Sequence, residues 1–269
     1  MPIVDVFGAY VEKLCDTDLR RARWLLKTGW EAQNLKYKLL PDRRLIPADR
    51  YLAGIMDAML KPLKVPERSA IISVFTPCEM LQEVGLNPYN VEGFSCYLSA
   101  SRVERTFLQQ AENAGISETL CSYHKTFLGA AGKGLLPKPN CIVCTNVMCD
   151  ANLLTFRALA ELYHVPLFSI DVPLQQTEDN VRYVAEQMRS LAAFLETCTG
   201  RRIEEEALKE RLRRSKRTLE KFREFQRARA DRYIPTDLVS PLYCGMTNNI
   251  LLGTPQEETY VDMLLRDVK

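Results

Sequence analysis

The densest chemical feature of the sequence is the stretch "NCIVCTNVMCD", which holds Cys141, Cys144 and Cys149. A fourth cysteine, Cys121, lies upstream in "ETLCSYHKTFLGAAGKG". The chain has nine cysteines, an odd count, and its first residues lack the basic and apolar regions of a secretory signal peptide. These features argue against a disulfide framework, so metal binding and core packing are the two interpretations to weigh.

Cys141 and Cys144 form a C-x-x-C pair within a short apolar segment that we expect to be a strand. Zinc ribbons and thioredoxin-type proteins place this motif at a turn or a helix start instead. Residues three apart on a strand point to opposite faces, and free cysteine is among the most buried residue types. We therefore expect both to lie in the core, and we expect a structural role for five others: Cys15, Cys78, Cys96, Cys198 and Cys244.

Cys149 lies at a predicted strand-to-helix turn, just before the helical pattern "DANLLTFRALAELYH". The free N–H groups and the dipole of a helix start stabilise a thiolate, which is the form that binds iron–sulfur clusters. Cys121 lies near a predicted break between two helical stretches. From the local sequence alone, a capping or core role stays open for both residues.

The elements that position these cysteines follow from the hydrophobic pattern. Residues 1–65 form a predicted helical N-terminal extension. Four short apolar segments then alternate with helical patterns, and two long C-terminal helices follow at about 177–199 and 203–231. This alternation predicts an α/β fold with a Rossmann- or flavodoxin-like parallel sheet flanked by helices. Ligands of such sheets bind beyond the carboxyl ends of the strands, which is where Cys149 falls.

Charge and composition exclude several function classes. The net charge of +2 gives no indication of a nucleic-acid or membrane-surface partner, and no apolar stretch is long enough to span a bilayer, so we expect a cytoplasmic protein. "GAAGKGLLP" lacks the P-loop order, so ATP hydrolysis is not expected. Only two histidines are present, which disfavours hydrolysis by a Ser/His or Cys/His pair. His124, three residues after Cys121, is a candidate proton donor; a supporting role is the alternative.

Several stretches, taken in order, resemble the 2-hydroxyacyl-CoA dehydratase D-component family, which includes benzoyl-CoA reductase subunits and double-cubane-cluster proteins. The resemblance runs from about residue 66 to 230. It is carried by the order and spacing of these segments: "SVFTPCEMLQEVGLNPY", "LCSYHKTFLGAA", "CTNVMCDANLLTFRAL", "VPLFSIDVP" and "LAAFLETCTGRRIEEEALKERLRRSKRTLEKF".

The resemblance implies a 4Fe–4S cluster, or an 8Fe–9S double cubane, held by three cysteines. Two of them match Cys121 and Cys149 by position. The third belongs to a second, similar α/β domain that this chain does not reach, with Cys244 kept open as an alternative. On this basis we expect residues 66–235 to form the cluster-binding α/β domain and residues 236–269 to form a connection toward the second domain.

The resemblance also implies a function. We expect an iron–sulfur subunit of a hydro-lyase that eliminates water from a 2-hydroxyacyl-CoA through a ketyl radical. The expected partners are an ATP-dependent activator protein that delivers the electron, a paralogous second subunit or a second copy of the chain, and the acyl-CoA substrate. Two alternatives stay open: a double-cubane or benzoyl-CoA-type reductase, and a non-catalytic cluster-binding or assembly partner.

Overall fold

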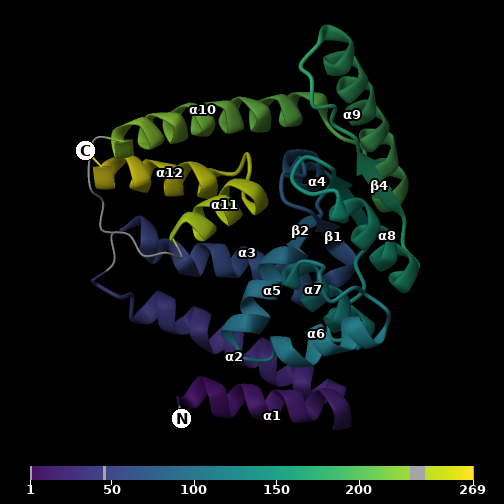
Figure 1. Ribbon diagram of the computed structural model, residues 1–269. Coiled ribbons are helices and arrows are strands. Elements are labelled where there is room, and N and C mark those ends of the chain that lie inside the picture. Colours follow the sequence, from purple (N-terminus) through teal and green to yellow (C-terminus); the bar gives the residue numbers. More distant parts are fainter. Residues whose placement is uncertain (1, 45–46, 231–239, 269) are drawn as a thin grey trace.

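The computed structural model describes residues 2–44, 47–230 and 240–268. Its centre is a parallel sheet with the strand order β2-β1-β3-β4, covered by helices (Figure 1). This confirms the predicted flavodoxin-like α/β fold. The chain places β2 on one side of β1 and returns to place β3 on the other, so the direction of winding switches between β1 and β3. The strands are β1 (Ser69–Ile72), β2 (Asn87–Asn90), β3 (Cys141–Thr145) and β4 (Leu167–Ile170).

The two central strands are buried along their whole length. Every residue of β1 and β3 is buried, as expected for parallel strands with helices on both faces. Ile71 of β1 pairs with Tyr89 of β2 on one side and with Ile142 of β3 on the other. Cys141 and Cys144 are both fully buried, which confirms their predicted place in the core.

Helices connect the parallel strands and run back across the sheet. The crossover between β2 and β3 consists of α5, α6 and α7, with breaks between them. The breaks include Arg102 and Gly115, which have φ angles of 59° and 90°. The connecting helices are α4 (Cys78–Glu83), α5 (Val91–Ala100), α6 (Glu104–Asn113), α7 (Ser122–Gly132) and α8 (Ala151–Tyr163).

The N-terminal extension is helical, as predicted, and Figure 1 shows α3 beside the sheet with α2 and then α1 below it. Trp30 of α2 anchors it, because its indole Nε1 donates a hydrogen bond of 3.0 Å to Ser101 Oγ after α5. The same ring packs 5.9 Å from Phe94 and from Tyr97. The elements are α1 (Ile3–Thr17), α2 (Leu19–Leu39), the short 3-10 helix η1 (Ala48–Tyr51) and α3 (Leu52–Lys64).

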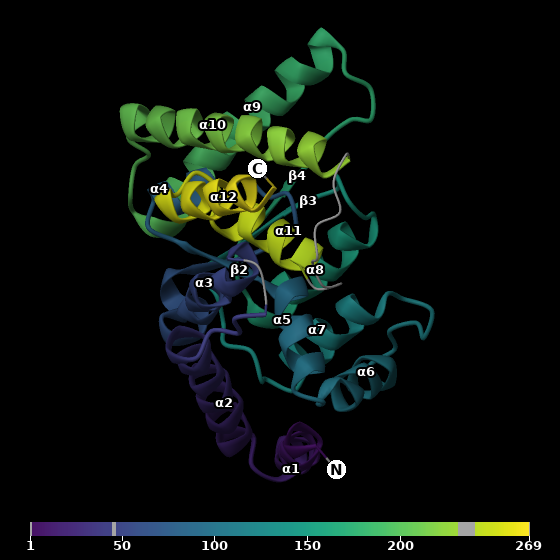
Figure 2. The same cartoon turned by 90° about the vertical axis from the view of Figure 1, so that its left-hand side faces the viewer.

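Two long helices follow the sheet, as predicted: α9 (Glu178–Thr199) and α10 (Glu205–Ala230), with Gly200 in the left-handed conformation between them. The segment predicted as a connection forms two helices in its described part, α11 (Ser240–Ile250) and α12 (Pro255–Val268). Figures 1 and 2 both show α12 running alongside α10. The division of the chain at residues 65 and 235 stays a prediction.

Buried polar contacts hold the C-terminal helices to α4. Ser215 of α10 donates a hydrogen bond of 2.8 Å to Glu79 Oε1 of α4. Within the C-terminal segment, the Gly253 N–H donates a hydrogen bond of 2.8 Å to Glu257 Oε2 of α12. Arg211 Nε lies 2.6 Å from Glu83 Oε2. Buried carboxylates need such donors, since an unpaired buried charge is strongly destabilising. In the described part of the chain no helix combines the length and the apolar character needed to cross a membrane.

Replacing Gly129 with alanine tests the packing of α6 against α7. A Cβ at this position would lie 1.9 Å from the Phe107 carbonyl oxygen, so the helices must separate. We expect Gly129→Ala to lower the free energy of unfolding by roughly 3 kcal/mol, measured by urea denaturation. Gly132→Ala, on the same helix with no atom within 4 Å of the new Cβ, is the control and should change stability little. Equal effects of the two substitutions would contradict this packing.

Candidate functional site

The two candidate ligand cysteines stand at the starts of two helices. Cys121 is the N-cap residue of α7; it is exposed, and its side chain makes no capping hydrogen bond. Cys149 is half-buried and precedes Asp150, the N-cap of α8. Since α7 leads back to the start of β3 and α8 leaves its end, both helices begin at the carboxyl edge of the sheet. The fold therefore brings both cysteines to the same edge.

His124 links these two helix starts. Its Nδ1 lies 2.9 Å from Thr155 Oγ1 of α8, and its ring centroid lies 5.2 Å from that of Phe127. The side chain is buried, and this burial lowers the pKa of His124, so the imidazole is neutral at pH 7. The geometry thus gives His124 a positioning contact between α7 and α8, while its role as a proton donor stays a prediction.

Helix α5 supplies a second contact to the start of α7. Ser95 Oγ donates a hydrogen bond of 2.9 Å to the Tyr123 carbonyl. The Tyr123 hydroxyl and the Cys96 thiol are hydrogen-bonded, which raises the pKa of Tyr123 to about 12. Cys96 Sγ in turn lies 3.7 Å from the Glu92 carbonyl oxygen, which accepts from it. Tyr123, two residues after Cys121, is therefore held by both its backbone and its side chain.

Glu92 is a residue of this edge that the sequence analysis missed. It lies in the first turn of α5, and its Oε2 accepts a hydrogen bond of 2.9 Å from the Val74 N–H, just after β1. Burial raises the pKa of Glu92 to about 7. A glutamate in the first turn of a helix is common because the helix dipole favours it, so the sequence carries no signal of this shift.

Two side-chain oxygens near Cys149 are buried without a hydrogen-bond partner, although Asn152 Nδ2 donates a hydrogen bond of 3.4 Å to the Thr145 carbonyl oxygen. Thr145 Oγ1 and Asn152 Oδ1 are buried and make no hydrogen bond to the described residues. Thr145 ends β3 and Asn152 lies in the first turn of α8, so they bracket Cys149 in sequence. Unsatisfied buried polar groups are rare, and such groups mark places where a bound group or ordered water completes the structure.

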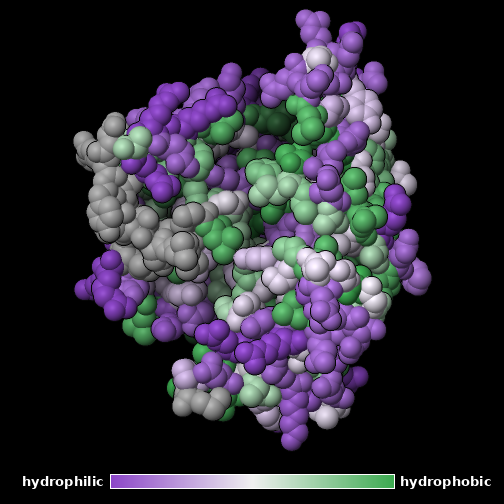
Figure 3. Space-filling view, in the orientation of Figure 1, coloured by the Kyte–Doolittle hydropathy of each residue, from purple (hydrophilic) through white to green (hydrophobic). Residues whose placement is uncertain are grey.

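Apolar side chains are exposed around the same edge. Phe75, after β1, is 56% exposed and has a φ of 67°, a conformation that is uncommon for a bulky residue and occurs at binding sites. Tyr123, Val147 and Met148 are also exposed. Figure 3 shows hydrophobic surface in the area that Figure 1 assigns to α4, α7 and α8, framed by the hydrophilic surface of α10.

A family described as 2-hydroxyglutaryl-CoA dehydratase, D-component, matches residues 73–269. The chain belongs to this family. The match covers most of the sheet, the candidate edge and the C-terminal helices, and it confirms the resemblance that the sequence motifs carry. The boundary of the match falls just after β1, so the N-terminal helices lie outside it.

Individual relatives are dehydratase subunits. The chain is 22% identical over 143 residues to the (R)-phenyllactyl-CoA dehydratase alpha subunit of Clostridium sporogenes, covering 50% of this chain and 35% of that subunit. It is 24% identical over 147 residues to the (R)-2-hydroxyisocaproyl-CoA dehydratase alpha subunit of Clostridioides difficile, covering 51% and 36%. A match of 26% over 87 residues to the Acidaminococcus fermentans (R)-2-hydroxyglutaryl-CoA dehydratase, subunit alpha, covers 31% and 18%. The chain spans about a third or less of the length of these relatives.

The donor set of this D-component chain fits an iron–sulfur cluster in type and is incomplete in number. Cys121 and Cys149 are thiols at helix starts on one edge, and unpartnered polar atoms lie nearby. Among the residues that the structure describes, no group of three or more His, Cys, Asp or Glu side chains is arranged to hold a metal ion. A cluster with three protein ligands would therefore take its third ligand from outside the described residues.

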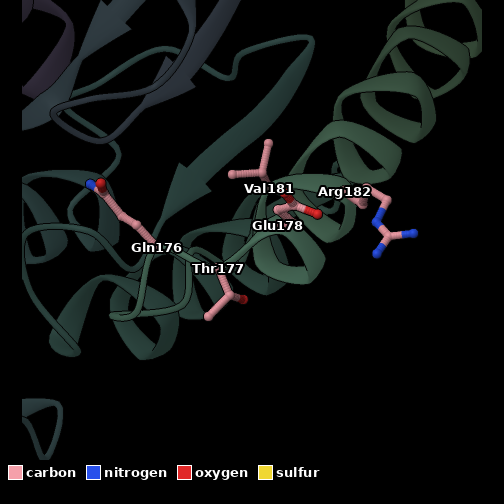
Figure 4. Close-up of a pocket in the computed structure, with 5 residues that line it drawn as sticks. All are labelled: Gln176, Thr177, Glu178, Val181 and Arg182. Atoms are coloured by element: carbon pink, nitrogen blue, oxygen red, sulfur yellow. The ribbon is translucent and has the colours of Figure 1, made fainter.

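A surface pocket near the start of α9 lacks the buried polar groups found at the carboxyl edge of the sheet. All five of its lining residues are exposed, and Figure 4 shows Arg182 directed away from Gln176. Thr177 Oγ1 accepts a hydrogen bond of 3.2 Å from the Asn180 N–H and so serves as a helix cap. No buried polar group lines this pocket, and we assign it no function. Its lining consists of Gln176, Thr177, Glu178, Val181 and Arg182.

The raised pKa values of Glu92 and Glu257, each about 7, predict two late-titrating carboxyls. In a 13C spectrum of glutamate-labelled protein we expect two carboxyl resonances with midpoints near pH 7. Glu92→Gln should remove one and Glu257→Gln the other, and each variant serves as the control for the other.

The raised pKa values of Glu92 and Glu257 also predict how the stability of the fold changes with pH. Burial holds the folded-state pKa of each carboxyl above its unfolded value of 4.5, so both groups destabilise the fold progressively as pH rises from about 4.5 to 7. Each Gln variant should therefore gain stability relative to the wild type over this range, in chemical denaturation at several pH values. A difference that stays constant with pH would contradict the assignment.

Proposed function

We propose that this chain is the cluster-binding portion of an iron–sulfur subunit in a 2-hydroxyacyl-CoA dehydratase system. The observation that carries the proposal is the placement of Cys121 and Cys149 at two helix starts on one sheet edge, with His124 and Thr155 joining the helices. Family membership supports it, since the matched relatives are alpha subunits of such dehydratases. The reaction would be a hydro-lyase step that removes water from a 2-hydroxyacyl-CoA.

The two cysteines would hold a 4Fe–4S cluster together with a further ligand from outside the described residues. When bound, such a cluster would supply the single electron that makes loss of the 2-hydroxyl feasible. The helix starts of α7 and α8 would stabilise the thiolates, because their free N–H groups carry partial positive charge. The electron would come from a separate ATP-dependent activator, and a second subunit would complete the enzyme.

Residues of this edge have separate tasks in the proposal. His124, neutral and hydrogen-bonded to Thr155, holds the start of α7 against α8. Glu92 would exchange a proton near neutral pH at Oε1, while the Val74 N–H holds its Oε2 in place. The leaving hydroxyl gains a proton and the β-carbon of the substrate loses one, so a carboxyl that titrates near 7 suits either transfer.

Anaerobic reconstitution with iron and sulfide tests the proposal. With an excess of a small thiol to fill the remaining ligand positions, we expect the wild-type chain to take up iron and acid-labile sulfide in equal amounts and to show cluster absorption. Cys121→Ala and Cys149→Ala should each lose this uptake. Cys198→Ala is the matched control, because Cys198 is half-buried like Cys149 but lies at the opposite end of the sheet. It should bind as much iron as the wild type.

Protection from alkylation gives a second readout. In the reconstituted wild type, Cys121 and Cys149 should react more slowly with iodoacetamide than in the metal-free chain, while Cys198 should not change. Equal iron uptake by all four proteins, or unprotected Cys121 and Cys149, would refute the ligand assignment. A double cubane would show twice the iron of a single 4Fe–4S cluster and would favour the reductase alternative.

A further inference from the structure

A second thiol pair lies at the opposite edge of the sheet. Cys141 is the first residue of β3, and Cys198 lies in the last turn of α9. Their side chains are hydrogen-bonded to each other. The neighbouring backbone is tied as well, because Asn140 Nδ2 donates a hydrogen bond of 3.3 Å to the Cys198 carbonyl oxygen. The two thiols, 57 positions apart in sequence, are therefore held together by the fold.

The two members of the pair differ in exposure and in acidity. Cys141 is fully buried, whereas Cys198 is partly exposed. The hydrogen bond from the Cys141 thiol lowers the pKa of Cys198, and the same bond together with burial raises the pKa of Cys141. Thiolate character and access are the two properties that make a cysteine reactive toward oxidants. Cys198 thus has the properties of an attacking thiol, and Cys141 those of a resolving thiol.

We propose that Cys141 and Cys198 form a redox-modified pair that closes to an intrachain disulfide when a peroxide reaches Cys198. The pair lies at the amino edge of the sheet, away from Cys121 and Cys149 at the carboxyl edge, so this modification is independent of cluster binding. The bond would fasten α9 to β3, the strand whose far end leads to Cys149.

The chemistry balances with hydrogen peroxide as the two-electron oxidant. The Cys198 thiolate attacks one peroxide oxygen, the O–O bond breaks, and Cys198 becomes a sulfenic acid while hydroxide leaves. Cys141 Sγ then attacks the Cys198 sulfur and displaces its hydroxyl, which leaves as water with the proton of the Cys141 thiol. The hydroxide takes up the proton that Cys198 lost. In sum, two thiols are oxidised to one disulfide and one peroxide is reduced to two waters.

Peptide mapping of the whole chain tests the proposal. Trypsin should release Cys198 in "SLAAFLETCTGR" and Cys141 in "GLLPKPNCIVCTNVMCDANLLTFR", which also holds Cys144 and Cys149. After a short peroxide treatment and alkylation of the remaining thiols, we expect these two peptides to be linked in the wild type and separated by dithiothreitol. The oxidised protein should also melt several degrees above the reduced protein, because the link constrains the unfolded chain.

Single substitutions identify the sulfurs. The link should be lost in Cys141→Ser and in Cys198→Ser but retained in Cys144→Ser, a buried cysteine on the same strand that contacts Ser169 instead. Cys198→Ser replaces a partly exposed residue, so it keeps the test valid if Cys141→Ser fails to fold. The proposal is overturned if the link persists in Cys198→Ser or Cys141→Ser, is lost in Cys144→Ser, or does not form while Cys198 is oxidised to the sulfinic acid.

Discussion

Parallel pairing of the four strands is the constraint on which the rest of this structure depends. It forces every strand to end at the same edge of the sheet and every returning helix to begin there. Free N–H groups and positive helix ends therefore gather at one edge, which is the part of the fold best suited to thiolates and other anions. Cys121 and Cys149 stand there although 27 other residues separate them, because the crossover before β3 and the turn after it share that edge.

Burial of the central strands explains why polar groups nearby are so carefully partnered. Both faces of β1 and β3 are buried, so a donor or acceptor near these strands has no water to bond with. Such a group destabilises the fold unless another protein group forms a hydrogen bond with it. Glu92 accepts a hydrogen bond from the Val74 N–H, and Glu257 accepts one from the Gly253 N–H. Burial raises the pKa of both carboxyls, and these hydrogen bonds offset part of the rise. The Thr145 Oγ1 and Asn152 Oδ1 atoms, on either side of Cys149 in the sequence, are exceptions because they are buried without a hydrogen-bond partner. A bound group or an ordered water molecule could supply the missing hydrogen bonds.

The sequence predicted those features that depend on local pattern. Apolar runs and helical spacing predicted the parallel sheet, the helical extension and the long C-terminal helices, and the position of Cys149 after a strand predicted its edge. Features that depend on tertiary contacts had no local signal. The 2.9 Å contact of Glu92 joins two segments 18 residues apart, and the pairing of Cys141 with Cys198 requires α9 to return past the start of β3. No local sequence motif predicts either of these two contacts.

The cysteines at the two ends of the sheet differ in exposure and in hydrogen-bond partners, and these differences in environment determine which reactions each cysteine can undergo. At the carboxyl edge, Cys121 is exposed and its side chain makes no capping bond, so its sulfur is available to an external electrophile or metal. At the amino edge, Cys198 is hydrogen-bonded to the thiol of Cys141, which lies within the core, so a partner for disulfide formation is adjacent to it. In the proposed chemistry, the hydrogen-bonded thiols of Cys141 and Cys198 would be oxidised to a disulfide, whereas the cysteines at the helix starts would bind the cluster. The length of β3 separates the two pairs and would keep these proposed reactions apart within one small sheet.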